Sequence, residues 1–254
     1  MNNILRAEYK KIFFLRFSKM YLLFTIGISL LAGLIFTITT NVTQGKTIQE
    51  LSVMEVFSAN MLGVDFANIL FIIFTALTIT REFTSQTIHT SLATVPNRKK
   101  FFIGKYIIFL LLTIILSALL VALIYLTSQS VLMVNDRTMV HLTDSRINQF
   151  VLGTLIMPVF YSLLTAAAAF FFKNSGGSIA FSLIIMAIPA LINMFSESIR
   201  RLLLPVMPQS AIHSLSGTAE TFEAMEVFPS ILVLFLWLMI TSIIALISFQ
   251  RSDF

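Results

Sequence analysis

Long apolar runs alternate with short polar connections along the whole chain. Six runs are long enough to cross the hydrocarbon core of a bilayer as helices, in which every backbone polar group is satisfied internally. They cover residues 21–40, 56–80, 101–127, 150–172, 178–194 and 227–249. The fifth run is the shortest and contains Pro189, so its far limit stays open. The pattern predicts an all-α integral membrane protein, with residues 1–254 forming one transmembrane domain of six helices.

The composition leaves little room for a soluble domain. Hydrophobic residues make up 57% of the chain and charged residues 11%, whereas soluble domains carry about 25% charged residues. No Gly-x-x-x-x-Gly-Lys-Ser/Thr loop is present, so the chain has no phosphate-binding loop of its own. We therefore expect a chain that is not an enzyme and binds no cofactor, with any ATP hydrolysed elsewhere.

The basic residues predict the orientation. With the N-terminus in the cytoplasm, twelve of the 17 Lys and Arg residues lie in cytoplasmic segments and five lie outside, as the positive-inside rule requires. Both termini are then cytoplasmic in a multi-pass protein of the cell membrane. The net charge of +5 reflects this topology, so a nucleic-acid partner is not expected.

Residues 1–19 have the pattern of an amphipathic helix that lies in the membrane interface. Apolar residues gather on one side of the helical wheel and lysines gather on the other. The apolar side holds Leu5, Tyr9, Ile12, Phe13 and Phe17, and the lysines are Lys10, Lys11 and Lys19. Such a helix can anchor the chain, dock a partner or do both.

A basic cytoplasmic segment, residues 81–100, connects the second and third runs. Ile88 and Leu92 have i, i+4 spacing on a short predicted helix that Pro96 ends. Glu82 is an acid at the inner membrane boundary, where it needs a partner. Arg81, Lys100 or Lys105 could supply one.

These residues resemble the permeases of ATP-binding-cassette type-2 exporters. The shared pattern is Glu-aromatic-x-x-small-Thr, then Pro-x-Arg about ten residues later, then a Lys that opens the next helix. Here the pattern consists of Glu82, Phe83, Thr87, Pro96, Arg98 and Lys105, and Gln86 stands where many members have Gly. The ending Phe249-Gln250-Arg251-Ser252-Asp253-Phe254 is similar to the aromatic-x-Arg-x-Asp ending common in the family.

The resemblance implies that two six-helix subunits, identical or related, pair above two ATPase subunits that bind ATP and Mg. The segment after the second span would be the coupling helix, which carries motion from the ATPase into the membrane. The residues expected to couple to the ATPase are Arg81, Glu82, Phe83, Thr87, Ile88, Leu92, Pro96 and Arg98. Within the family the chain looks most like the phenol-soluble-modulin exporters, which secrete amphipathic peptides. Lipids, antibiotics and other small amphiphiles are the alternative cargo.

Polar residues inside the spans give a second group of candidates. Ser58, Asp65, Asn68 and Thr75 fall on one arc of the second span at 100° per residue. The family resemblance places the second and fifth spans along the translocation path, so these residues and Asn193 are expected to line it. A hydrogen-bond network between packed helices explains the same pattern equally well. Asp65 as a proton carrier is a third interpretation.

Residues 196–226, between the last two runs, mix apolar and charged residues and are broken by prolines. This pattern is typical of short re-entrant helices, and in the family the region forms an extracellular gate. The gate candidates are Arg200, Arg201, Leu203, Pro205 and Pro208. An ordinary exposed loop is the alternative.

Other classes of function lack support. The chain has no cysteine, and its three histidines lack metal-ligand spacing, so no metal site is expected. Gly-x-Ser-x-Gly, His-Glu-x-x-His and paired acids within a span are also absent, which argues against an intramembrane enzyme. A membrane scaffold or immunity partner that does not transport remains the second alternative.

Overall fold

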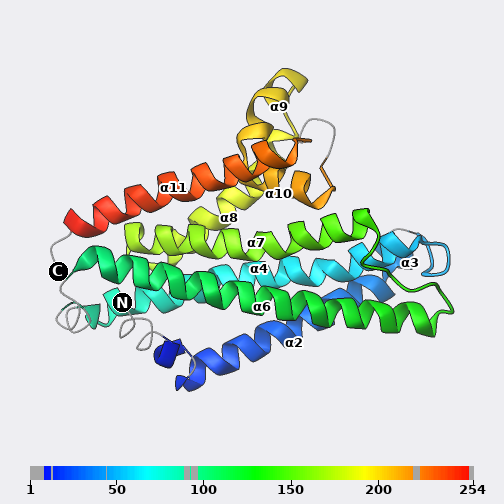
Figure 1. Ribbon diagram of the computed structural model, residues 1–254, viewed down its shortest axis with the longest axis horizontal. Coiled ribbons are helices and arrows are strands. Elements are labelled where there is room, and N and C mark those ends of the chain that lie inside the picture. The colour runs from blue at the N-terminus through cyan, green and yellow to red at the C-terminus, as the bar shows by residue number, and fades with distance from the viewer. Residues whose placement is uncertain are drawn as a thin grey trace.

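The computed structural model describes residues 9–12, 14–43, 45–88, 92, 97–219 and 224–251. Every regular element within these residues is helical, and the long helices lie side by side in one bundle (Figure 1). Six helices are long and apolar enough to cross a membrane. The predicted all-α membrane protein with six spans is therefore confirmed.

The six long helices are followed along the chain by their labels in Figure 1. They are α2 (Arg16–Ile38), α4 (Val53–Thr84), α6 (Arg98–Val134), α7 (Ser145–Phe172), α8 (Ser175–Ile192) and α11 (Val227–Arg251). The short elements are α3 (Thr40–Thr43), α9 (Glu197–Leu203), η1 (Leu204–Val206) and α10 (Pro208–Ser216). α2 begins and α11 ends at the same end of the bundle, which we call the terminal end.

Helix caps explain why several spans are longer than their apolar runs. Ser52 and Glu55 form a capping box that starts α4, and the Asn97 side chain accepts a hydrogen bond from the backbone N–H of Lys100 at the start of α6. Because these caps are polar residues outside the apolar runs, hydropathy alone does not include them.

The N-terminal segment differs in its boundary from the prediction. Tyr9–Ile12 and Phe14 are helical, but Leu15 is extended, with φ −71° and ψ 124°, and α2 begins at Arg16. The interfacial helix expected over residues 1–19 is thus too long at its C-terminal end, because the first span starts inside it. Residues 1–8 and 13 lie outside the described residues, and the placement of this segment at an interface stays a prediction.

Small residues allow α2 and α4 to approach closely. A Cβ atom added to Gly63 would lie 2.3 Å from the carbonyl oxygen of Ser29, and one added to Gly33 would lie 2.3 Å from that of Asn60. No side chain fits at such a distance, so the two backbones are in direct contact.

Buried polar side chains join α4 to α6. Asn60 is fully buried, and its Nδ2 donates to Ser128 Oγ at 2.7 Å, Thr127 Oγ1 at 3.0 Å and the Ile124 carbonyl oxygen at 3.3 Å. Tyr106 of α6 makes a similar connection to α7, because its hydroxyl donates to the Leu163 carbonyl oxygen at 2.7 Å. These contacts are the packing bonds expected between helices in an apolar medium.

A tight turn at residues 85–87 ends α4. Gln86 has φ +55°, in the left-handed region that favours glycine, and its side chain is exposed. Many members of the family that the chain resembles have glycine at this position, and this left-handed backbone conformation favours glycine.

We predict that Gly63→Ala destabilises the protein by about 1–3 kcal/mol, because the new methyl group forces α2 and α4 apart. Gly27→Ala is the matched control on α2, since nothing lies within 4 Å of the added Cβ. Thermal unfolding of the purified variants measures the difference. Equal stability of the two variants would show that the close approach of α2 and α4 is unimportant.

The turn generates a second prediction. Gln86→Gly should leave the protein at least as stable, because relief of a left-handed conformation that costs roughly 1–2 kcal/mol offsets the added freedom of the unfolded chain. Gln86→Val should destabilise it, since a β-branched residue is strained there. The same unfolding assay compares them, and a Val variant as stable as the Gly variant contradicts the assignment.

Candidate functional site

The Glu82 carboxylate lies at the centre of an ion cluster at the terminal end of the bundle. Its Oε1 accepts a hydrogen bond from Lys11 Nζ at 2.7 Å, and Lys105 Nζ forms an ion pair with the same oxygen at 2.8 Å. The Glu82 side chain is 10% exposed and that of Lys105 is 1% exposed. Lys105 Nζ also lies 5.5 Å from the centre of the Phe101 ring, a cation–π contact. The cluster joins the N-terminal segment, α4 and α6.

The partners of Glu82 were predicted only in part. Lys105 was one of three candidates and is confirmed, whereas Arg81 and Lys100 are exposed and make no ion pair with Glu82 in the described part of the chain. Lys11 was not foreseen, because 71 residues separate it from Glu82. The available signal was its place on the polar side of the predicted N-terminal helix.

An aromatic cluster lies beside the ion cluster and joins four helices. Phe83 of α4 contacts Phe170 of α7 and Phe249 of α11, with ring centres 6.0 and 6.2 Å apart. Phe170 and Phe249 are 5.1 Å apart, and Phe101 of α6 stacks on Phe249 at 6.0 Å. The aromatic residues of both motifs, Phe83 and Phe249, therefore pack against each other.

Within the predicted coupling region, residues 81–100, the structure describes residues 81–88, 92 and 97–100. Ile88 and Leu92 are both helical; Ile88 is buried in the core, and Leu92 is partly buried against it. The two side chains thus share the face that their spacing predicts. Thr87 Oγ1 lies 3.0 Å from Ser85 Oγ in the preceding turn. Pro96 and residues 89–91 and 93–95 lie outside the described residues.

Arg98 binds the end of α11. Its Nη1 donates to the carbonyl oxygens of Gln250 at 3.0 Å and Phe249 at 3.3 Å. A cation at a helix C-terminus stabilises carbonyl groups that have no partner within the helix. Arg98 therefore holds α11 against the start of α6, whatever its part in coupling.

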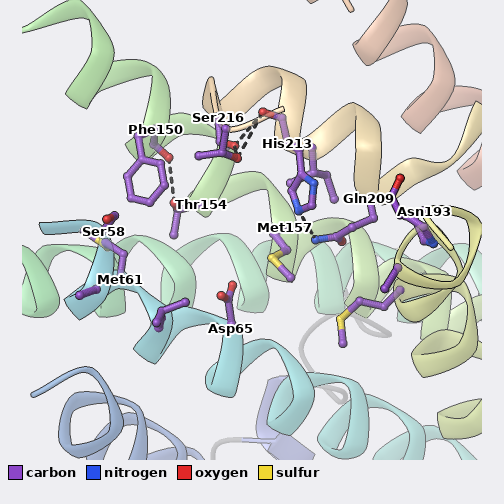
Figure 2. Close-up of a pocket in the computed structure, with 18 residues that line it drawn as sticks. Ser58, Met61, Asp65, Phe150, Thr154, Met157, Asn193, Gln209, His213 and Ser216 are labelled. Atoms are coloured by element: carbon purple, nitrogen blue, oxygen red, sulfur yellow. Dashed lines mark hydrogen bonds between the residues drawn. The ribbon is translucent and has the colours of Figure 1, made fainter. Parts of the chain in front are cut away.

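A cavity of ≈ 660 Å³ lies between α4, α7, α8 and α10 (Figure 2). Ser58 and Asp65 of α4 and Asn193 at the end of α8 line it, so three of the five predicted path residues meet there. Its walls are otherwise largely apolar, with three methionines and an aromatic ring among them: Met61, Met157, Met186 and Phe150.

Asp65 points into this cavity from α4 (Figure 2). It lies about 18 Å along the helix from Val53 at 1.5 Å per residue, well inside the span. Its carboxylate makes no hydrogen bond or ion pair with any described residue. An intramembrane acid without such a contact is a functional candidate.

A chain of hydrogen bonds runs from the buried Tyr161 to Gln209 and His213 of the opposite wall. Tyr161 OH donates to Gln209 Oε1 at 2.8 Å, and Gln209 Nε2 lies 3.0 Å from His213 Nε2. Because the amide oxygen faces Tyr161, the amide nitrogen donates to His213, whose Nε2 is then an acceptor. Sequence reasoning did not single out Gln209 or Tyr161, and it treated His213 only as one of three histidines without metal-ligand spacing.

The other two path candidates lie elsewhere. Asn68 is buried and its Nδ2 lies 3.3 Å from Met186 Sδ, while the buried Thr75 hydroxyl has no partner in the described residues. Neither lines the cavity. The polar residues on this arc of α4 therefore do not all line the cavity. Asn68 instead makes a contact between packed helices, as the alternative interpretation expects.

The gate candidates lie on α9, η1 and the start of α10. Arg201 forms an exposed ion pair with Glu197, and Leu203 is also exposed, whereas Pro208 is buried at the first position of α10. Arg200 lies on α9 and Pro205 lies in η1. α10 itself packs closely on α7, since a Cβ at Gly153 would lie 2.3 Å from Ser216 Cβ. A gating role for these residues stays a prediction.

No group of three or more His, Cys, Asp or Glu residues with metal-binding geometry occurs among the described residues. The two candidate regions are therefore an ion and aromatic cluster at the terminal end and a largely apolar cavity between the spans.

Comparison with known proteins agrees with this geometry. The family model described as ABC-2 family transporter protein matches residues 4–189, well over half of the chain. No curated protein matches the chain. The match includes the ion cluster and most of the cavity wall, and the chain belongs to the ABC-2 family of transporter membrane proteins.

Proposed function

We propose that this chain is the permease subunit of an ATP-driven exporter in the cell membrane. Two such subunits, identical or related, pair above two ATPase subunits, which bind ATP and Mg and supply the energy. Both termini and the turn after α4 face the cytoplasm. The cargo is an amphipathic peptide of the phenol-soluble-modulin kind, or another amphiphile such as a lipid or an antibiotic.

The Glu82 ion cluster is the observation that supports coupling to the ATPase at the terminal end of the bundle. The turn at residues 85–87 follows Glu82 directly, and Glu82 binds lysines from two other segments. A push on the turn would move the end of α4, the N-terminal segment and the start of α6 together. α4 also lines the cavity, so the same helix connects the proposed ATPase contact with the proposed path.

The cavity supports an amphiphilic cargo. Thioether and aromatic groups adapt to apolar chains of different shape. Amides and hydroxyls at the same wall can bind the polar part of the cargo, as in other ligand sites. Peptide, lipid and antibiotic cargo share this chemistry, and a transport assay with each class distinguishes them.

We predict that Glu82→Gln uncouples ATP hydrolysis from transport. The change also leaves the buried Lys105 ammonium without the carboxylate, a loss of about 3–5 kcal/mol for buried pairs. The double variant Glu82→Gln/Lys105→Met removes the buried charge as well, so it should recover much of the stability and remain uncoupled. ATPase turnover and cargo export in reconstituted vesicles measure both effects.

Glu197→Gln is the matched control, because its exposed pair with Arg201 is worth about 0–1 kcal/mol. It should leave stability and export unchanged. Wild-type export by the folded double variant contradicts coupling through Glu82. If the partner ATPase turns over equally with and without this chain, a scaffold or immunity partner becomes the better description.

A further inference from the structure

Among the described residues, one fixed charge lines the cavity of α4, α7, α8 and α10. Asp65 is the only Asp, Glu, Lys or Arg among the residues that line it. Its carboxylate has no hydrogen bond or ion pair within the described ranges, although an acid inside a membrane is normally paired. The wall thus supplies a negative charge and no fixed cation to balance it.

His213 attracts the Asp65 carboxylate electrostatically, but the two side chains make no direct ion pair in the part of the chain that the structure describes. It is the other titratable side chain in the lining and lies on the opposite wall (Figure 2). Its Nε2 lies 3.0 Å from Gln209 Nε2, and the Gln209 amide oxygen accepts from Tyr161 OH, so these contacts hold the His213 ring in the wall. A cation that enters the cavity therefore meets a carboxylate that has no direct hydrogen bond or ion pair with the described residues.

The size and walls of the cavity favour an organic cation over a metal ion. Hard metal ions need six or more close oxygen ligands, usually including carboxylates, and the described part of the chain has no group of three or more His, Cys, Asp or Glu residues that could hold a metal ion. A volume of ≈ 660 Å³ holds a much larger group. The Phe150 ring, the methionine sulfurs and the apolar residues suit a nitrogen cation attached to an apolar body.

We infer that Asp65 binds a positively charged nitrogen of the cargo, so that the cavity selects amphiphiles carrying an ammonium group. The inference rests on the proposed function and makes it more specific. A lysine side chain of an amphipathic peptide and the amine of a single-chain lipid present the same group. Asp65 would pair with either one while the thioether and aromatic walls contact the apolar part.

Binding of matched charged and neutral probes to the full chain in nanodiscs tests this inference. One pair is dodecylammonium and dodecanol, and the other is an amphipathic helical peptide with lysines and the same peptide with glutamines. The single tryptophan of the chain, Trp237, packs against the cluster that includes Met157 and Ile212 of the cavity wall, so its fluorescence can report binding.

We predict that Asp65→Asn weakens binding of the charged probes at least ~10-fold and changes binding of the neutral probes less than about twofold. Asp65→Glu should keep the preference for charge. Glu55→Gln is the matched control, since it removes an acid from the same helix outside the cavity lining. If only one charged probe shows the effect, the cargo source is the peptide or the lipid accordingly.

Three results would overturn the inference. The first is equal affinity of the wild type for charged and neutral probes. The second is an Asp65→Asn variant that keeps its affinity for the charged probes. The third is weakened pairing of two subunits with unchanged probe binding, which would assign the counter-charge to a second subunit. Charge-selective binding without export would instead contradict the proposed function, and export without charge selection would contradict only this inference.

Discussion

The buried carboxylate of Glu82, shared by Lys11 and Lys105, is the constraint on which the terminal end of the structure depends. Three segments far apart in the chain meet at one oxygen atom, with both lysine nitrogens within 2.8 Å. Burying the charges of Glu82 and Lys105 is costly, and their mutual attraction offsets this cost, while Lys11 stays partly exposed. The aromatic cluster beside them adds contacts with α7 and α11, so five segments of the chain meet at this end.

A second constraint is the direct contact between α2 and α4. Backbones in contact at Gly33 and Gly63 cannot slide without separating, and Asn60 fixes α4 against α6. α4 is consequently held at its middle by neighbours and at its end by ions. Its remaining face forms the cavity wall, where Ser58 and Asp65 lie. The same helix therefore supplies both a rigid contact and a polar lining.

The spans could be predicted from the sequence because a long apolar run by itself indicates a helix surrounded by an apolar medium. Their ends could not, since α4 and α6 are extended by polar caps such as Ser52 and Asn97. The residues that line the cavity were predicted only partly. A helical wheel gives the direction of each side chain around the helix axis, but it does not show which part of the protein lies in that direction. Asn68 contacts Met186, while Asp65, on the same arc, faces the cavity. Lys11 and Gln209 became recognisable only when distant segments were brought together.

Cysteine cross-linking tests most directly whether the ATPase acts on the turn after α4. The natural chain has no cysteine, so Ser85→Cys places a single thiol at the exposed turn and Ser130→Cys places one on the exposed surface near the other end of the bundle. With an ATPase carrying cysteines across its docking surface, the account predicts a cross-link from residue 85 that changes with ATP, and none from residue 130. A cross-link from residue 130 alone would contradict it.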